Sequence, residues 1–202
     1  VVGIGPGNIE LITPLALKTI HAADVLVGGK RQLSLFKELK CKKIVFSKID
    51  DFKKALEEDG NVVVLASGDP AIYGILDLVL KYKNRQEVEV IPGISSIQYI
   101  MAKLRLPMKD MAIVSLHGRE EDLLSKVKGN SIVIVLTDDI HSPQYIAKEL
   151  MKNYISNVKI FVGENLSYDN EVITSFTVEE LASFPSEFDI NVVVIKRCGT
   201  TV

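Results

Sequence analysis

Residues 61–74, NVVVLASGDPAIYG, join a short apolar run to a polar turn and a second apolar pattern. Val62–Ala66 is continuously apolar, which is typical of a strand buried on both faces of a parallel sheet. Asp69 then suits a helix N-cap, and Pro70 suits the first helical position. Beyond them apolar residues recur at helical spacing, namely Ile72, Ile75, Leu76 and Val79. The stretch therefore predicts a strand, a tight turn and a helix.

The turn at Ser67 and Gly68 falls where small ligands bind in open α/β sheets, at the carboxyl end of a strand. A helix N-terminus attracts anions, because its free N–H groups carry a partial positive charge. Here the Asp69 carboxylate would repel a phosphate, and it would suit a sulfonium, an ammonium group or ribose hydroxyls. The same pattern also fits an Asp69 that only caps the helix.

Composition describes an ordinary globular chain of 202 residues, of which 47% are hydrophobic and 25% charged. This length allows one large domain or two small α/β lobes, each with its own core. A net charge of −2 does not favour nucleic-acid binding. No apolar run has the length of a membrane span.

The two cysteines, Cys41 and Cys198, lie far apart and form no Cys-x-x-Cys pattern. Their spacing favours a reduced, cytoplasmic setting over a disulfide framework or a structural zinc site. The histidines His21, His117 and His141 also lack the spacing of metal ligands. We therefore expect no metal site.

Strand and helix patterns alternate along the first half of the chain. Helices are predicted through Leu15–Ile20 and at Asp51–Glu58, besides the one after Asp69. The predicted strands are Val1–Ile4, Ala23–Val27, Lys43–Phe46, Val62–Ala66 and Val88–Ile91. This alternation indicates a parallel sheet with helices on its faces.

A boundary is predicted near RLPMKD, Arg105–Asp110, which divides the chain into lobes of residues 1–108 and 109–202. A helix with Ile97, Ile100, Met101 and Leu104 precedes it. The second lobe has predicted strands at Ala112–Ser115, Ile132–Leu136, Lys159–Val162, Glu171–Ser175 and Asn191–Ile195, and helices at Pro143–Met151 and Val178–Phe184. Because residues 165–176 look like a hairpin, we expect a mixed sheet.

The opening glycines, GIGPGN at residues 3–8, look superficially like a dinucleotide-binding fingerprint. Pro6 removes a backbone donor where a pyrophosphate would need one. Gly28 and Gly29 end the second strand, where an acidic partner for a ribose would be expected. A rigid turn between strand and helix explains the motif, and a nicotinamide-dependent oxidoreductase is not favoured.

Three turns together resemble those of the tetrapyrrole methyltransferases: GIGPGN, SGDPAIYG at residues 67–74 and VIPGISS at residues 90–96. They follow the family's order and spacing, and the resemblance covers essentially the whole chain. Ile9 departs from the pattern, since relatives often carry proline there. The longer stretch VIPGISSIQYIMAKLRLP, followed by SLHGR at residues 115–119, is most similar to members that methylate carbon 5 of the corrin ring in cobalamin synthesis.

The resemblance implies an α/β fold of two lobes, with a parallel sheet in the first lobe and a mixed sheet in the second. It also implies that S-adenosylmethionine binds in the cleft between them. By motif matching, the cofactor-binding residues are Pro6, Gly68, Asp69, Ile72, Ser95 and Ser96, with Leu136 of VIVLTD from the second lobe. Without the family, Ser95 and Ser96 also suit helix capping, and Leu136 suits a buried strand.

The implied acceptor is a flat tetrapyrrole with acetate and propionate groups, which needs cations beside an apolar trough. The candidates are Lys30, Arg31, His117 and Arg119, since arginine binds a carboxylate through two parallel hydrogen bonds. Lys30 and Arg31 also fit a solvated charged face. Methyl transfer from a sulfonium depends largely on positioning. Tyr73, His117 or Asp138 could accept a proton, and the sequence does not choose among them.

Two other function classes fit the sequence. One is a methyltransferase of the same fold that acts on another tetrapyrrole position, a protein or ribosomal RNA, and the other is a non-catalytic S-adenosylmethionine-binding module. The family implies a homodimer. Because two lobes use all 202 residues, we expect one methyl addition without decarboxylation. A separate decarboxylating methyltransferase for carbon 15 is then the expected partner, and the presence of cobalt in the substrate stays open.

Overall fold

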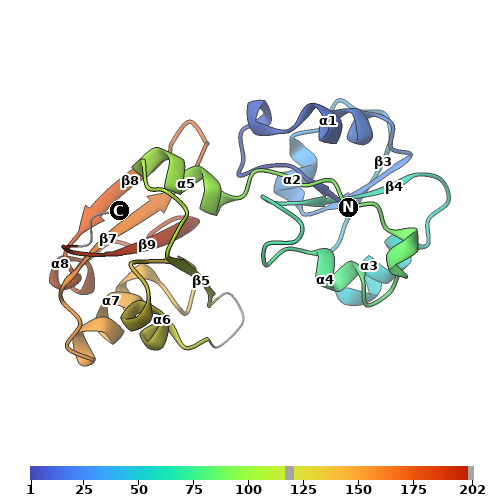
Figure 1. Ribbon diagram of the computed structural model, residues 1–202. Helices are drawn as coiled ribbons and strands as arrows, with labels where there is room; N and C mark the ends of the chain where they lie inside the picture. The colour runs from blue at the N-terminus through green and yellow to red at the C-terminus, as the bar shows by residue number, and fades with distance from the viewer. Residues whose placement is uncertain (117–120, 200–202) are drawn as a thin grey trace. The chain divides into compact units, whose positions relative to one another are not determined.

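The computed structural model describes residues 1–116 and 121–199. By their contacts these residues form two units, which divide between Ser96 and Ile97. Each unit has its own sheet, helices and buried core (Figure 1). No helix in the described part of the chain combines the length and the apolar character needed to cross a membrane.

The first unit alternates strands and helices, as predicted. Its four-stranded sheet has the order β1-β4-β2-β3, and every neighbouring pair is parallel. The strands are β1 (Val2–Gly3), β2 (Val25–Gly28), β3 (Lys42–Val45) and β4 (Val62–Ala66). The helices are α1 (Pro14–His21), α2 (Lys30–Ser34), α3 (Ile49–Leu56) and α4 (Leu76–Val79), with short 3-10 helices η1 (Ile9–Leu11) and η2 (Arg85–Glu87). The predicted bounds of β4 are confirmed.

Helices cover both faces of this sheet (Figure 1). Leu26 and Leu65 pack with residues of α1 and α2 on one face. Val27 and Val64, one position away, pack with residues of α3 and α4 on the other. Because successive side chains of a strand point to opposite faces, a strand covered on both sides needs a continuous apolar run. This is why β2 and β4 were recognisable in the sequence.

The predicted strand Val88–Ile91 is wrong except at its last residue. Ile91 forms a single parallel bridge with Val2. Gly3 N donates to Ile91 O at 2.9 Å, and Ile91 N donates to Val1 O at 2.9 Å. Before Ile91 no ladder forms: Glu89 O accepts from the Val1 N-terminus at 2.7 Å, and Val90 is 38% exposed.

The predicted helix start at Asp69 and Pro70 is also wrong, because α4 begins only at Leu76. Residues 67–75 form turns instead. Tyr73 adopts a φ of 50°, and a Cβ atom on Gly74 would lie 2.4 Å from Pro70 O. This curl is incompatible with a continuous α-helix, and Leu76 N donates to Pro70 O at 3.2 Å.

The second unit has the mixed sheet that the sequence predicted, in the order β5-β6-β9-β7-β8. β5 and β6 are parallel, whereas β6–β9, β9–β7 and β7–β8 are antiparallel. The hairpin predicted at residues 165–176 contains only the turn and the second strand of the β7–β8 pair. The strands are β5 (Met111–Ser115), β6 (Ile132–Leu136), β7 (Val158–Glu164), β8 (Val172–Phe176) and β9 (Asn191–Arg197). The helices are α5 (Ser96–Leu104), α6 (Leu123–Gly129), α7 (Pro143–Lys152) and α8 (Val178–Ala182), of which α6 was not predicted.

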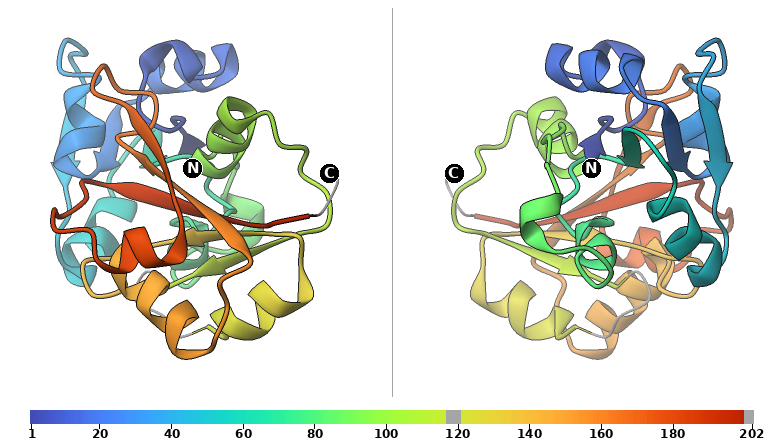
Figure 2. Two further views of the ribbon diagram at one scale, coloured as in Figure 1. Left: turned by 90° about the vertical axis from the view of Figure 1, so that its left-hand side faces the viewer. Right: turned by 90° about the vertical axis from the view of Figure 1, so that its right-hand side faces the viewer.

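Helices α6, α7 and α8 cover one face of the second sheet, where Val162 of β7 is buried among them (Figure 2). The next residue, Gly163, faces the opposite side, and a Cβ atom there would lie 2.6 Å from Ile100 Cδ1 of α5. Helix α5 thus packs on the other face of this sheet. The contacts accordingly divide the chain after Ser96, whereas the boundary suggested by the sequence, between residues 108 and 109, lies beyond α5.

Candidate functional site

Three glycine turns meet at the carboxyl edge of the first sheet. Gly5 follows β1 and pairs with Gly68, which follows β4: Gly68 N donates to Gly5 O at 2.8 Å, and Gly5 N to Gly68 O at 3.3 Å. A Cβ atom on Gly93 would lie 2.2 Å from Gly68 O, and one on Gly3 would lie 2.5 Å from Gly93 N. Only glycines allow backbones to approach so closely. The edge is therefore built largely of backbone groups.

Asp69 joins two of these turns through its carboxylate. Oδ1 accepts a hydrogen bond from Ala71 N at 2.8 Å, and Oδ2 accepts one from Gly93 N at 3.1 Å. The side chain is half-buried. Asp69 thus caps no helix but holds the turn after β4 against the turn after Ile91, and it leaves a negative charge at this edge.

The other cofactor residues predicted in the first unit lie around the same turns. Pro6 follows Gly5 and is half-buried. Ile72 N donates to Asp69 O at 3.4 Å. A Cβ atom on Gly68 would lie 3.3 Å from Ser95 Cα, and Ser95 is only 4% exposed. Ser96 begins α5. The fold therefore brings the predicted residues of this unit to one edge, although their role in binding stays a prediction.

Gln32, which the sequence analysis missed, ties a further turn to this edge. Its Oε1 accepts from Gly29 N at 2.7 Å, and its Nε2 donates to Ser67 Oγ at 2.9 Å. The turn after β2 is therefore linked to the turn after β4. Lys30 and Arg31, both exposed, begin helix α2 in this linked turn. A glutamine three residues after Gly29, at a helix start, was the available signal.

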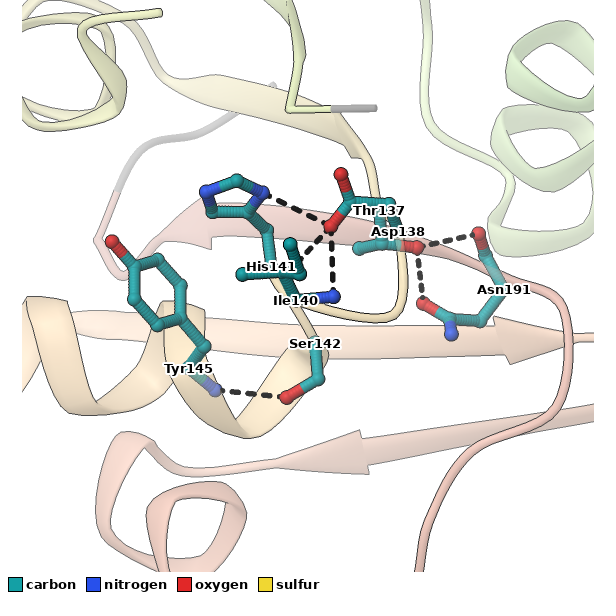
Figure 3. A network of polar contacts seen from close by, with 7 residues as sticks. All are labelled: Thr137, Asp138, Ile140, His141, Ser142, Tyr145 and Asn191. Atoms are coloured by element: carbon teal, nitrogen blue, oxygen red, sulfur yellow. Dashed lines mark hydrogen bonds and ion pairs between the residues drawn. The ribbon is translucent and has the colours of Figure 1, made fainter. Parts of the chain in front are cut away.

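In the second unit, the turn after β6 is held by a polar network (Figure 3). Leu136, the cofactor residue predicted here, ends β6 and is half-buried. The next residue, Thr137, donates through Oγ1 to Asn191 Oδ1 at 2.8 Å and lies 3.1 Å from Asn191 O. The start of β9 thus fixes the point at which the chain leaves β6.

Asp138 organises the rest of this turn. Its Oδ1 accepts from Ile140 N at 3.0 Å and from His141 N at 2.6 Å. The Nδ1 atom of His141 lies 3.0 Å from the same oxygen. The His141 ring meets the ring of Tyr145 edge-on, with centroids 5.1 Å apart. The sequence analysis missed His141, for which the signal was an aspartate three residues before a histidine at a Ser-Pro helix start.

The three candidate proton acceptors predicted from the sequence lie in different parts of the chain. Tyr73 is 38% exposed in the turn before α4, in the first unit. Asp138 lies in the network after β6 in the second unit. His117 and the proposed acceptor-binding Arg119 lie outside the described residues. Within residues 1–116 and 121–199, no group of three or more His, Cys, Asp or Glu side chains could hold a metal ion.

A second polar cluster ties α5 to the turn between β7 and β8. Glu171 accepts from Lys103 Nζ at 2.7 Å and from Ser167 N at 2.7 Å. Burial acts to raise the Glu171 pKa, but hydrogen bonds from Lys103, Ser167 and Tyr99 outweigh it and hold that pKa below its usual value. The hydrogen bond to Glu171 also raises the pKa of Lys103. Burial, followed by the interaction with Glu171, raises the pKa of Tyr99.

The family model of the tetrapyrrole (corrin/porphyrin) methylases matches residues 1–182. The chain belongs to this family. A methylase relative from Methanocaldococcus jannaschii, described as a probable cobalt-precorrin-7 C(5)-methyltransferase, is 38% identical over 91% of this chain and 90% of its own length. The cobalt-precorrin-7 C(5)-methyltransferase of Salmonella typhimurium is 35% identical over 96% of both chains.

Among solved structures, this methylase chain is similar to the uroporphyrin-III C-methyl transferase of Thermus thermophilus, complexed with S-adenyl homocysteine. The TM-score is 0.77 at 22% identity, over 96% of this chain and 95% of that one. At this identity the likeness shows a shared fold. It confirms the tetrapyrrole methylase fold that the three turns predicted.

Proposed function

We propose that this chain is an S-adenosylmethionine-dependent C-methyltransferase that acts on carbon 5 of precorrin-7 or cobalt-precorrin-7 in cobalamin biosynthesis. The observation that carries the proposal is the identity of 38% and 35% to two relatives named for this reaction. In both cases the match extends over at least nine-tenths of each chain. It therefore includes both units rather than a shared binding motif alone.

The residues at the edge of the first sheet fit S-adenosylmethionine. The glycine turns pack backbone against backbone at this edge, so that a ligand there would meet mainly backbone groups. The half-buried Asp69 carboxylate suits ribose hydroxyls or a positive charge and opposes a phosphate. The residues that would hold it are Pro6, Gly68, Asp69, Ile72, Ser95 and Ser96 from the first unit, and Leu136 from the second. When bound, this cofactor supplies a methyl group activated by its sulfonium.

The acceptor's carboxylates would be bound by Lys30, Arg31, His117 and Arg119. Lys30 and Arg31 are exposed at the start of α2, and the turn that carries them is linked to the β4 turn through Gln32. The substitution Arg119→Ala should impair use of the tetrapyrrole and leave S-adenosylhomocysteine binding nearly unchanged. If calorimetry shows both affinities falling equally, Arg119 belongs to the cofactor site.

Turnover with a panel of precorrins, with and without cobalt, tests the proposal. Mass spectrometry of the product should show one added methyl group, and NMR should place it on carbon 5. Methylation at a different carbon would indicate another tetrapyrrole methyltransferase. Binding of S-adenosylmethionine without turnover on any precorrin would indicate a non-catalytic module.

We also propose a homodimer in the cytoplasm that adds one methyl group and removes no carbon dioxide. The two relatives named for carbon 5 alone support the single methylation. Carbon 15 would then be methylated and decarboxylated by a separate partner enzyme. Retention of every carboxyl group in the product, and a dimer mass by light scattering, are the expected results; a loss of 44 Da, roughly one carbon dioxide, contradicts the first.

A further inference from the structure

The turn between β6 and α7 contains a carboxylate–imidazole pair that the proposed site residues do not include. His141 Nδ1 lies 3.0 Å from Asp138 Oδ1, and the two side chains are only 20% and 16% exposed. We infer that His141 accepts the proton released on methylation of the tetrapyrrole carbon, and that Asp138 is its positioning residue. This inference rests on the proposed function.

The pair defines which nitrogen of His141 can accept a proton. An ionised carboxylate has only acceptor atoms, so Nδ1–H of the ring donates to Asp138 Oδ1. Nε2 then carries a lone pair. Figure 3 shows this second nitrogen on the side of the ring away from Asp138. The hydrogen bond at one nitrogen thereby prepares the other as a base.

The ring is also held in place. Asp138 Oδ1 is fixed by the backbone N–H groups of Ile140 and His141 itself. Thr137, the residue before Asp138, is hydrogen-bonded to Asn191 of β9, and the Tyr145 ring lies edge-on against the imidazole. A base held by this many contacts needs little reorganisation when it takes a proton.

The position of the turn fits the role. β5 and β6 are parallel, so their carboxyl ends lie at one edge of the second sheet. In α/β sheets this edge is where ligands bind. Leu136, the proposed cofactor residue of this unit, ends β6, and Asp138 follows it by two residues. The pair is therefore carried by the same turn as that proposed contact.

The reaction requires a proton acceptor for reasons of charge. The tetrapyrrole carbon gives an electron pair to the new C–CH3 bond, and the pair of the broken S–CH3 bond stays on sulfur. The positive charge of the sulfonium thus passes to the tetrapyrrole. A methine carbon that gains a methyl group then loses its hydrogen as a proton, and the C–H electron pair returns to the ring. Nε2 of His141 takes that proton and later releases it to water.

Two substitutions separate this role from a structural one. His141→Asn keeps a side-chain N–H that can reach Asp138 but has no basic nitrogen, and Asp138→Asn keeps an oxygen for the two backbone donors but loses the charge. With cobalt-precorrin-7, the single-turnover rate should fall about 100-fold or more in His141→Asn, in line with the usual contribution of a general base. Calorimetry should show S-adenosylhomocysteine affinity within about twofold of wild type.

Ser142→Ala is the matched control, because Ser142 Oγ caps α7 by accepting from Tyr145 N at 3.2 Å. This variant should lose thermal stability and keep its rate within about twofold. Asp138→Asn should lower the single-turnover rate in the wild-type background and have no further effect on it in a His141→Ala background. Imidazole in solution should restore activity to His141→Ala. An equal loss from Asp138→Asn in both backgrounds overturns the positioning role.

Nitrogen NMR of the free wild-type protein supplies a test that needs no turnover and no folded variant. The ¹⁵N signals of His141 should show the tautomer with the proton on Nδ1, and a proton on Nε2 instead would overturn the inference. If the wild type methylates its substrate and His141→Asn does so equally fast, the inference fails and the proposed function stands. If the wild type methylates no precorrin, both fail.

Discussion

The Asp69 carboxylate is the feature of the first unit whose removal has the most specific expected result. Asp69→Ala deletes the acceptor of Gly93 N, a part-buried donor, and that of Ala71 N, an exposed one. Leaving the part-buried N–H without a partner costs about 1–3 kcal/mol, and losing the exposed hydrogen bond costs about 1 kcal/mol. We therefore expect a loss of about 2–4 kcal/mol in the free energy of unfolding of this unit.

Urea denaturation measures this loss. With a slope of about 2 kcal/mol per M, the midpoint of unfolding should fall by roughly 1–2 M. Asp59→Ala, which removes an exposed carboxylate from the same unit, is the control and should leave the midpoint nearly unchanged. Asp69→Asn should be intermediate, because its amide oxygen still accepts from Ala71 N while its NH2 group faces Gly93 N.

Ligand binding separates the two roles of this residue. Loss of a charged hydrogen bond to the proposed cofactor weakens S-adenosylhomocysteine binding by about ten- to a hundredfold. The measurement is calorimetry at low temperature, where the variant is folded. An Asp69→Ala protein that unfolds at the wild-type urea midpoint would refute the reasoning about the two turns, and unchanged affinity in the folded variant would remove Asp69 from the proposed site.

Four further substitutions have defined outcomes. Gly93→Ala places a Cβ atom 2.2 Å from Gly68 O and should lower the free energy of unfolding by about 3 kcal/mol. Gly129 is exposed at the end of α6 with open space around it, so Gly129→Ala should raise the free energy of unfolding by about 0.5 kcal/mol in the same denaturation assay. Since the folded-state pKa of Glu171 is depressed, its ion pair stabilises the protein above the ordinary glutamate pKa, and this stability is lost as the pH falls through the folded value. The difference in melting temperature between wild type and Glu171→Gln should therefore be present at pH 7 and shrink below about pH 4. Gln32→Ala removes the acceptor of Gly29 N and should speed amide hydrogen exchange at Gly29, and unchanged exchange would contradict that hydrogen bond.

Sequence alone determined the elements whose signal is local. The continuous apolar run Val62–Ala66 identified β4 with its observed bounds, because a strand between two layers of helices is apolar at every position. The mixed second sheet was predicted from the hairpin pattern at residues 165–176, although the first strand of the observed hairpin, β7, precedes that range. The family followed from three turns in a fixed order. Glycines mark where backbones approach closely, so their spacing carries information about the site that survives at low overall identity.

Tertiary contacts decided what local patterns could not. Asp69 and Pro70 have the ideal sequence for a helix start, yet Asp69 bonds to Gly93, a residue 24 positions away, and the chain turns instead of forming a helix. Ile91 forms only a single bridge, to Val2, and Gln32 links the turn after β2 to the turn after β4 because Ser67 lies within hydrogen-bond distance of it. The pair of His141 and Asp138 is different, because its partners lie only three residues apart and a short window did contain its signal. A hydrogen bond between distant residues depends on where the whole sheet brings their backbones, and no short window of sequence contains that information.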